Sequence, residues 1–351
     1  MPTSTPSTAD ILRRLLDADQ DLPPEYNNGF GNHLPMALQA LQAMGADTLR
    51  LQQFRTAYGQ HFKGQPRLLA EAPTTDWQSL RGHGDAAYGP LRSHFAQALA
   101  DVGMAATLRQ ALPDLLPGIT AAAFHGLIRT AHAVEAEHHG ELASGLAYWA
   151  ARWQGLTPAR VAGPLLDFEN WAAQLVADAP TTSVNGPLIS VRIEAALQTP
   201  AYQRLGAALS PQNELPQLLR RLAGLALERY LVSRNFTVLH MITGLRALRV
   251  LLPWVEVEMP LAQAILVQAF TAAYLAARVL PLATPLTEPS EQVSLSWPLL
   301  CRAATESDDE HVVKLVHACR EEAAFYGDPR YLSAATLVLG AAARTKHLLP
   351  R

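Results

Sequence analysis

The sequence predicts an all-α protein, built as one large irregular array of helices. Apolar residues recur at helical spacing along most of the chain, Gly and Pro fall mostly between these segments, and strand-like alternation is scarce. The chain has 351 residues, of which 49% are hydrophobic, so it has ample material for a large core. We expect residues 1–10 to form a disordered tail and residues 11–351 to fold as a single domain.

Capping signals place the individual helices. A helix over 33–41 has Asn32 as its N-cap and Pro35 in its first turn, and Gly45 ends it. A second helix is capped by Asp47 and has an apolar stripe of Leu49, Phe54, Tyr58 and Phe62. A helix over 120–139 is capped by Thr120 and ended by Gly140. Further helices are predicted over 85–102, 141–153, 217–233, 236–252, 261–279 and 331–349. Two polar stretches, 178–187 and 281–292, are predicted to be lids or connectors.

Bulk properties exclude several classes of protein. A net charge of −3 without a basic run argues against a nucleic-acid partner. Cys301 and Cys319 are too few for a disulfide scaffold, so reduced thiols in a cytoplasmic protein are expected. The most apolar stretch, 261–282, carries two glutamines and an arginine, which favours a core helix over a membrane span. We therefore expect a soluble protein and leave its oligomeric state open.

One helix near the C-terminus carries an imidazole and an amine on the same side. Ser307 and Glu310 form a predicted capping box, and Gly327 supplies the stop. His311 and Lys314 lie one turn apart and point within roughly 60° of each other, so they can share a site. A buried lysine is neutral, paired or chemically modified, because an unpaired ammonium is too costly in an apolar interior. A lysine that reaches the surface beside an ordinarily hydrogen-bonded histidine is the alternative.

Other histidines lie in similarly apolar company. His125 precedes Gly126, which would let another helix or a ligand approach closely. His132 follows seven residues later and points the same way, within about 20°. His240 has apolar neighbours, and His33 stands at a helix start. Taken singly, each is more often a core histidine than a ligand.

Familiar catalytic motifs do not occur in the sequence. It contains no GxGxxG after a strand, no P-loop, no GxSxG, no HExxH and no CxxC pair. Glu135 and His138 supply one copy of the Glu-x-x-His spacing of di-iron bundles, and a second copy on another inward face is missing. His138 and His139 are attributed to a helix C-terminus, whose partial negative charge favours a cation.

Four sequence blocks contain the histidines and the lysine singled out above. They are residues 32–38 (NHLPMAL), 123–129 (AFHGLIR), 239–243 (LHMIT) with 247–249 (ALR), and 309–315 (DEHVVKL). In this order they resemble the recurring blocks of the questin oxidase-like family, and the resemblance spans nearly the whole chain. The spacing of Trp77, Leu80, Gly84 and Tyr88 and the segment 327–331 (GDPRY) are similar to further family blocks.

This resemblance implies an all-α oxygenase with a central buried metal pocket. Its expected substrate is a small polycyclic aromatic molecule of the anthraquinone or polyketide type, opened with dioxygen by Baeyer–Villiger-type oxidation or carbon–carbon cleavage. The resemblance also implies a mononuclear non-haem iron, Fe(II), held by histidines and a lysine carboxylated on its amine. The matching residues are His33, His125, His240, His311 and Lys314, of which Lys314 and His125 are the expected catalytic residues. Whether NADPH serves as an external reductant is left open.

The chemistry of these side chains suits such a site. Imidazole nitrogens bind ferrous iron well, and a carboxylate adds a hard anionic ligand. Burial lowers the pKa of a lysine, and the resulting neutral amine can add carbon dioxide to form a carbamate that a metal retains. A metal-dependent hydrolase with a carbamylated lysine is one alternative, and a non-catalytic helical ligand-binding protein is another.

Five further residues are expected at the substrate pocket. Tyr88, Arg129, Trp149 and Tyr326 are predicted to line it. His132 departs from an aromatic position of the family, so it is placed next to the ligands and not among them.

Overall fold

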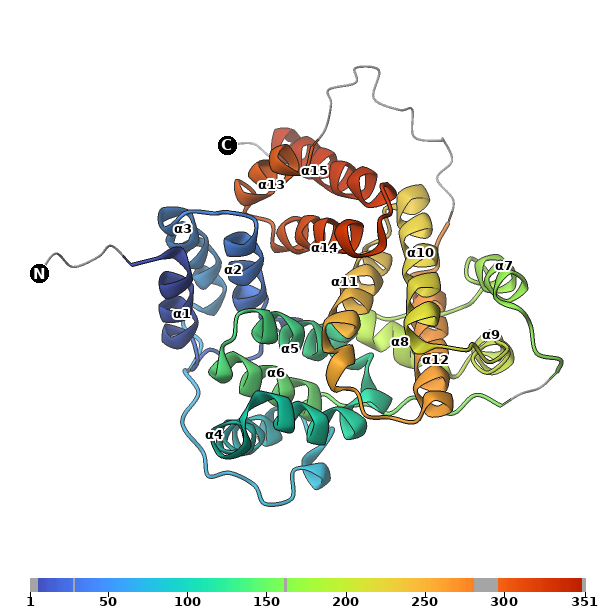
Figure 1. Ribbon diagram of the computed structural model, residues 1–351, viewed down its shortest axis with the longest axis horizontal. Helices are drawn as coiled ribbons and strands as arrows, with labels where there is room; N and C mark the ends of the chain where they lie inside the picture. The colour runs from blue at the N-terminus through green and yellow to red at the C-terminus, as the bar shows by residue number, and fades with distance from the viewer. Residues whose placement is uncertain (1–5, 28, 161–162, 281–295, 349–351) are drawn as a thin grey trace, which may run out of the picture.

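Helices carry the whole architecture of the computed structural model, which describes residues 6–27, 29–160, 163–280 and 296–348 (Figure 1). The α-helices are α1 Thr8–Ala18, α2 Leu34–Ala43, α3 Thr48–Tyr58, α4 Asp85–Leu115, α5 His125–Glu135, α6 His139–Ala151, α7 Phe168–Asp178, α8 Ile189–Leu197, α9 Pro200–Leu205, α10 Leu215–Ser233, α11 Phe236–Leu251, α12 Met259–Ala277, α13 Trp297–Thr305, α14 Glu310–Tyr326 and α15 Arg330–Leu348. Short 3₁₀ helices are η1 Gly59–Phe62, η2 Gln78–Leu80, η3 Leu116–Gly118, η4 Ala121–Phe124 and η5 Leu252–Trp254. The all-α prediction is confirmed.

The strands of the described residues form one small antiparallel hairpin. β1 (Glu25–Tyr26) pairs with β2 (Phe30–Gly31), with Tyr26 opposite Phe30 and Glu25 opposite Gly31. The hairpin ends directly before α2, so it holds the start of that helix against the body of the protein.

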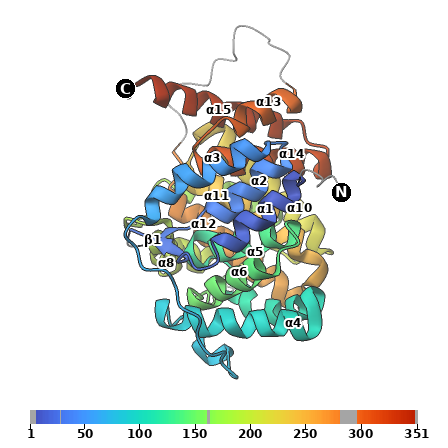
Figure 2. The ribbon, with the colours of Figure 1, turned by 90° about the vertical axis from the view of Figure 1, so that its left-hand side faces the viewer.

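Four helices surround the centre of the molecule. α2 packs against α5, α5 against α11, α11 against α14, and α14 against α2, which closes a ring of helices (Figure 1). The other helices support this ring from outside: α1 and α3 pack on α2, α6 packs on α5 with α4 beneath it, α10 and α12 pack on α11, and α13 and α15 pack on α14 (Figures 1 and 2). Residues at the inner ends of the four ring helices can therefore meet, although they lie far apart in the sequence.

The start of α14 differs from the prediction in one functionally important detail. Asp309, and not Ser307, is the N-cap, and its carboxylate accepts hydrogen bonds from the backbone N–H groups of His311 (2.8 Å) and Val312 (3.3 Å). The predicted capping box is therefore wrong, because Asp309 already supplies the capping oxygen. The Glu310 side chain is consequently free to face the protein interior. Gly327 ends the helix in the left-handed conformation, as predicted.

The predicted helix over 120–139 is broken at its start and again at its end. Ala122, Ala123 and Phe124 have positive φ values of 47°, 57° and 68°, so α5 begins only at His125. Left-handed backbone costs an alanine about 1–2 kcal/mol, and nothing in an alanine-rich sequence signals it. Packing compensates for this strain, because Phe124 lies against Gly244 of α11, where an added Cβ would meet its ring at 3.1 Å.

The second break makes His138 a helix start. The chain turns at Glu137, whose φ is 49°, and α6 begins at His139. The Nδ1 atom of His138 accepts a hydrogen bond from the backbone N–H of Glu141 at 3.0 Å. His138 is thus an N-cap, and the predicted role of this residue and of His139 at a helix C-terminus is wrong.

Smaller differences concern the edges of elements. α1 already begins at Thr8, capped by Ser7, so the predicted tail is too long, while residues 1–5 lie outside the described residues. α4 continues through a kink at Gly103 to Leu115 instead of ending at 102. Leu49 is exposed and does not belong to the stripe. The helices α1, α7, α8, α9 and α13 are additional to those predicted. The stretch 281–292 lies outside the described residues.

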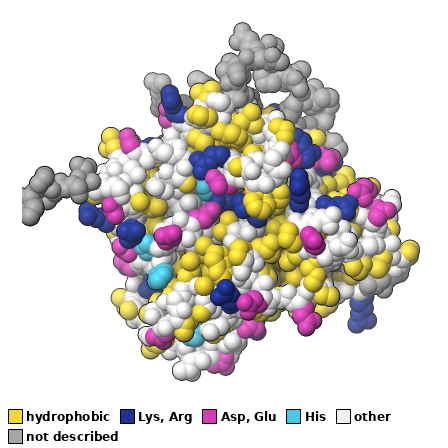
Figure 3. Space-filling view, viewed as in Figure 1, with side chains coloured by type: hydrophobic (Ala, Val, Ile, Leu, Met, Phe, Trp, Pro, Cys, Tyr) yellow, Lys and Arg dark blue, Asp and Glu magenta, His cyan; other side chains and the backbone are white. Residues whose placement is uncertain are grey.

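Two helical segments are long and apolar enough to cross a membrane, namely Phe236–Trp254 and Met259–Ala277. The buried share of the most apolar window is 67% in the first segment and 72% in the second. Core helices show this degree of burial. On the face shown in Figure 3, hydrophobic side chains form a broad band, and acidic and basic side chains are interspersed around it.

The close crossing of α5 and α6 yields a stability prediction. A Cβ added at Gly126 would lie 2.5 Å from both Cα and Cβ of Trp149, so backbone would have to move. We expect Gly126→Ala to lower the free energy of unfolding by about 1–3 kcal/mol in denaturant titrations. The control is Gly224→Ala on α10, where the nearest atom would be the end of Arg330 at 3.9 Å; it should raise stability by about 0.5–1 kcal/mol. A Gly126→Ala variant as stable as the wild type would contradict this helix crossing.

Candidate metal centre

Four histidines, one from each helix of the central ring, meet at one place. His33 is the N-cap of α2, His125 begins α5, His240 lies in the second turn of α11, and His311 lies in the first turn of α14. Their ring centroids are 4.6 Å apart for His33 and His125, 5.2 Å for His125 and His240, 5.4 Å for His240 and His311, and 4.7 Å for His311 and His33. The imidazoles therefore close a ring in the same order as the helices that carry them.

Hydrogen bonds fix how several of these rings face. The Nε2 atoms of His33 and His125 converge to 2.9 Å. The Nδ1 atom of His240 is 2.9 Å from the carbonyl oxygen of Phe236, and the His125 ring has a hydrogen bond to the backbone of Ala122. When one ring nitrogen donates to a backbone carbonyl, the other is left unprotonated and available as a ligand.

The start of α2 is held so that His33 projects inward. Its backbone N–H donates to the Tyr58 hydroxyl at 3.0 Å, and the Asn32 side chain accepts from the backbone N–H of Leu34 at 3.1 Å. Gly31 lies directly against the cluster, because a Cβ there would meet Nδ1 of His125 at 3.3 Å and Nε2 of His33 at 3.4 Å. A glycine thus leaves the space in which the two imidazoles approach each other.

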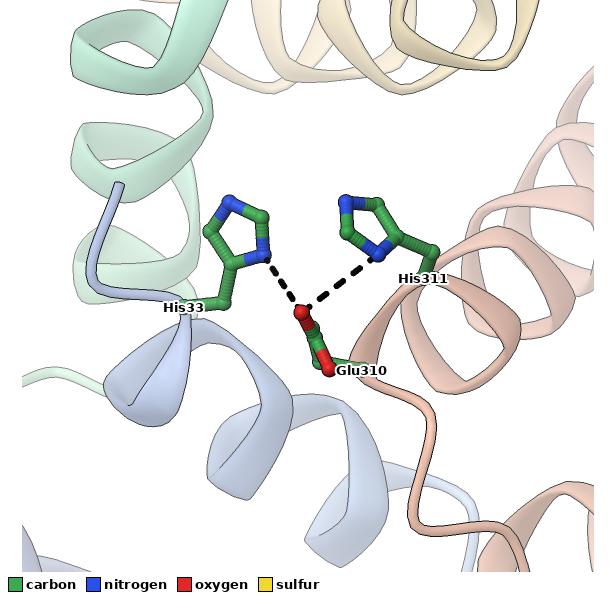
Figure 4. A group of neighbouring side chains, drawn as sticks. All are labelled: His33, Glu310 and His311. Carbon is green, nitrogen blue, oxygen red and sulfur yellow. Dashed lines mark ion pairs between the residues drawn. The ribbon is translucent and has the colours of Figure 1, made fainter. Parts of the chain in front are cut away.

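A carboxylate completes the cluster. Oε1 of Glu310 lies 3.4 Å from Nδ1 of His33 and 3.4 Å from Nδ1 of His311, and it stands between the two rings (Figure 4). One ligand atom from each of these three residues lies within 4.8 Å of the others, as in groups that can hold a metal ion. The sequence analysis missed Glu310 because it was assigned to a helix cap, although its place beside His311 was a usable signal.

Lys314 is buried one turn beyond His311. It is 2% exposed, and its amine has no hydrogen bond or ion pair with the described residues. Burial lowers the pKa of Lys314 to about 8, against the opposing effect of the Glu310 and Asp309 carboxylates. A lysine that reaches the surface is therefore excluded, and the neutral amine is more populated near neutral pH than it is for an exposed lysine.

Burial favours the neutral form of His33, His125 and His240. Burial, and next the charge of Lys314, keeps the pKa values of His33 and His125 well below the usual range. Burial does the same for His240, with smaller contributions from His125, His311 and Lys314. The amine of Lys314 is thus close enough to act on all three rings, and neutral imidazole is the form that ligates metals.

A cavity of about 520 Å³ opens onto the cluster. Its buried end contains all four histidines and Glu310, whereas the more exposed Phe30, Val191 and Phe236 lie at its rim. The other lining residues are Glu25, Tyr26, Gly29, Gly31, Ala122, Ala123, Arg152, Gln154, Pro187, Leu188, Ile189, Ser190, Arg192 and Glu194. The walls therefore come from the hairpin, the strained turn before α5, the start of α11, and α8 with the end of the 178–187 stretch that precedes it.

Three of the predicted pocket residues lie elsewhere in the core. Arg129 forms a buried ion pair with Glu141 at 2.9 Å, and the Trp149 indole donates to the carbonyl of Gly118 at 3.0 Å. Tyr88 is buried in α4. None of these three side chains lines the cavity. The cavity reaches α5 at its first turn, whereas Arg129 lies one turn further along that helix. Tyr88 belongs to α4 and Trp149 to α6.

The remaining two predicted pocket residues are also displaced. Nδ1 of His132 lies 2.6 Å from the Gln39 side-chain oxygen, and its ring is 5.6 Å from that of His317. His132 thus belongs to a buried polar pair two turns beyond the cavity. Tyr326 ends α14, about 22 Å along the helix axis from His311, and its ring lies under the Arg220 guanidinium. Neither residue lines the cavity.

A comparison with known families identifies the family of the chain. The family model described as questin oxidase-like matches residues 30–221, which is 192 of the 351 residues. The chain belongs to the questin oxidase-like family. The resemblance seen in the sequence is thereby confirmed, and the family's name indicates an oxidase-type enzyme. No curated protein matches the chain.

The matched range contains two of the four clustered histidines. His33 and His125 lie within residues 30–221, as does α8 with its part of the cavity wall. His240, His311 and Lys314 follow that range, so their association with the family residues rests on the fold. Two parts of the chain, one inside and one outside the matched range, together form the cluster.

Proposed function

We propose that this questin oxidase-like chain is a mononuclear non-haem iron oxygenase that opens a ring of a polycyclic aromatic substrate of the anthraquinone or polyketide type. His33, His125, His240 and His311, together with a carboxylated Lys314, would hold the Fe(II) ion in a central pocket. The observation that carries the proposal is the closed ring of four imidazoles at the buried end of a substrate-sized cavity.

The donor atoms suit one ion. Nitrogens that bind a metal as neighbouring ligands, each at about 2.1 Å, are roughly 3 Å apart, and the Nε2 atoms of His33 and His125 are separated by 2.9 Å. The backbone hydrogen bonds of His125 and His240 are of the kind that orients ligating imidazoles. Nδ1 of His33 is buried without a hydrogen-bond partner, and Oε1 of Glu310 lies 3.4 Å from it, so a polar atom at this place is left unsatisfied beside a carboxylate.

Lys314 can supply an anionic ligand after modification. Its neutral amine attacks carbon dioxide and loses a proton, which gives a carbamate anion on the side chain. Burial favours the neutral amine, and the metal would stabilise the carbamate once it has formed. Lys314 and His125 are the residues on which we expect activity to depend most strongly.

The cavity suits an aromatic substrate. When bound, the iron would supply the activation of dioxygen. The protein's own contribution is to hold the substrate against the cluster: the Phe236 ring is 4.7 Å from the rings of both His240 and His311, and Phe30 and Val191 add apolar surface at the rim. A volume of about 520 Å³ lies within the range of small-molecule sites, and the depth of the histidines removes the reacting region from bulk water.

Metal content and oxygen uptake test the proposal together. Protein purified after iron-supplemented expression should contain about one iron per chain by elemental analysis. Dioxygen consumption, followed with an oxygen electrode with and without NADPH, should rise when a panel of hydroxylated anthraquinones is added. Protein without bound transition metal, or oxygen uptake that no member of the panel stimulates, would contradict the oxygenase proposal.

A metal-dependent hydrolase is the second candidate. The group of Glu310 with His33 and His311 favours it, because a carboxylate and imidazoles around a carbamylated lysine also suit metal-activated water. Bound zinc in place of iron, together with hydrolysis that does not depend on dioxygen, would support this function over the first.

A further inference from the structure

A cationic side chain without a carboxylate partner faces the cavity. Arg192 of α8 lines it, and its guanidinium makes two hydrogen bonds, from Nη1 to the carbonyl of Gly186 at 3.2 Å and from Nη2 to the hydroxyl of Thr237 at 3.3 Å. No carboxylate of the described residues forms an ion pair with it. Two of its five N–H donors are used, so three remain for a ligand.

The other arginine of the cavity differs in this respect. Arg152 donates two hydrogen bonds to the Glu25 carboxylate, at 3.0 and 2.6 Å, and a further one to Asp85 at 2.5 Å. Its charge is therefore neutralised inside the protein. Glu194 also reaches the cavity from α8, but it lies two residues beyond Arg192, about 200° around the helix axis, and forms no ion pair with it in the described part of the chain.

Arg192 is held close to the histidine cluster. Its partner Thr237 lies three residues before His240 on α11, which is about 4.5 Å along the helix axis. Phe236, whose ring contacts the rings of His240 and His311, precedes Thr237 directly. A ligand that stacks on Phe236 would thus lie beside the imidazoles, and the guanidinium of Arg192 is hydrogen-bonded to the adjacent residue Thr237.

We propose that the cavity selects aromatic substrates that carry a carboxylate, and that Arg192 is the specificity-determining residue that binds it. The inference rests on the proposed function in taking this cavity as the substrate site. A guanidinium binds a carboxylate through two parallel charge-assisted hydrogen bonds, and the free donors of Arg192 are available for such a pair. The apolar rim around it weakens competition from water, so the pair discriminates charged from neutral ligands.

Binding of two matched ligands tests this selectivity without turnover. Anthraquinone-2-carboxylate and anthraquinone-2-carboxamide have the same ring and nearly the same shape, and they differ in charge. Titration calorimetry on the purified full-length protein under anaerobic conditions should show about tenfold tighter binding of the carboxylate, which corresponds to ~1.4 kcal/mol. Arg192→Gln should reduce this preference to about twofold or less, mainly by weakening the binding of the carboxylate.

The matched control is Arg302→Gln, which removes an exposed arginine of α13 and should keep the full preference. Wild-type protein that binds the two ligands equally, or that binds neither, would overturn the inference, as would an Arg192→Gln variant that keeps the preference. The outcome is independent of the metal chemistry. An iron-containing, oxygen-consuming protein without carboxylate preference refutes the role of Arg192 alone, whereas selective binding by a protein without oxygenase activity refutes the proposed function alone.

Discussion

Replacing Lys314 with alanine is expected to remove the bound metal and the substrate-dependent oxygen uptake while the protein stays folded. The side chain is buried among apolar neighbours on α14, so its loss leaves a small cavity but no unpaired charge. Loss of an anionic ligand should lower metal affinity by more than the ~10–100-fold that follows from mutation of an outer partner of a ligand. Elemental analysis, circular dichroism and an oxygen electrode measure the three quantities.

Chemical rescue sharpens this prediction. The cavity left by Lys314→Ala can admit a small carboxylate, so acetate or bicarbonate should restore part of the metal content, whereas Lys314→Met fills the space and should not respond. Lys63→Ala, which changes an exposed lysine, is the control and should behave as the wild type. A Lys314→Ala protein with unchanged metal content would remove this residue from the site.

The second large effect is expected for His125 and His240. Each ring is buried, has a hydrogen bond to a backbone group, and lies in the closed ring of imidazoles. We expect His125→Ala and His240→Ala each to lower iron affinity and oxygen uptake by at least about 100-fold, because each removes one of the neutral nitrogen donors. Metal titration of each purified variant measures the loss.

The control must be a histidine whose side chain has no structural role. His83 is exposed and meets this requirement, so His83→Ala should bind metal normally. His138 does not meet it, because it caps α6 and its replacement should cost about 1 kcal/mol of stability. Equal metal binding by all three alanine variants, at positions 83, 125 and 240, would show that the ligands had been chosen wrongly.

The sequence predicted the fold class and many helix ends for clear physical reasons. Apolar spacing identifies long amphipathic helices, and local caps such as Asp47 and the glycine stop at Gly327 act through backbone atoms only a few residues away. The burial of Val312, Val316 and Cys319 on α14 follows from the same periodicity. These features depend on short-range geometry, which a single sequence contains.

Features that depend on distant packing were missed. The left-handed turn at Ala122 and Ala123 exists because Phe124 packs on α11, and alanines alone favour a helix. α8, which supplies Arg192 to the cavity, is a short helix between breakers and gives a weak periodic signal. The cavity wall could therefore not be derived from the sequence, and pocket residues chosen from their chemistry, such as Tyr326, lie elsewhere.

The candidate ligands could be predicted in part from local spacing, but their meeting in space depends on distant packing. Local spacing paired His311 with Lys314, and resemblance to family blocks added His33, His125 and His240, which the fold then gathers into one cluster. The role of Glu310 in the site was missed because this side chain was assigned to a helix cap. In the structure Asp309 caps the helix, and Glu310 lies beside His311.

Anomalous diffraction at the iron absorption edge, from crystals of the iron-loaded protein, tests the central claim most directly. The proposed site predicts one strong peak among the imidazoles of His33, His125, His240 and His311, with density for an extra carboxylate on the Lys314 amine. A peak elsewhere, or none among these imidazoles, would contradict the proposed centre.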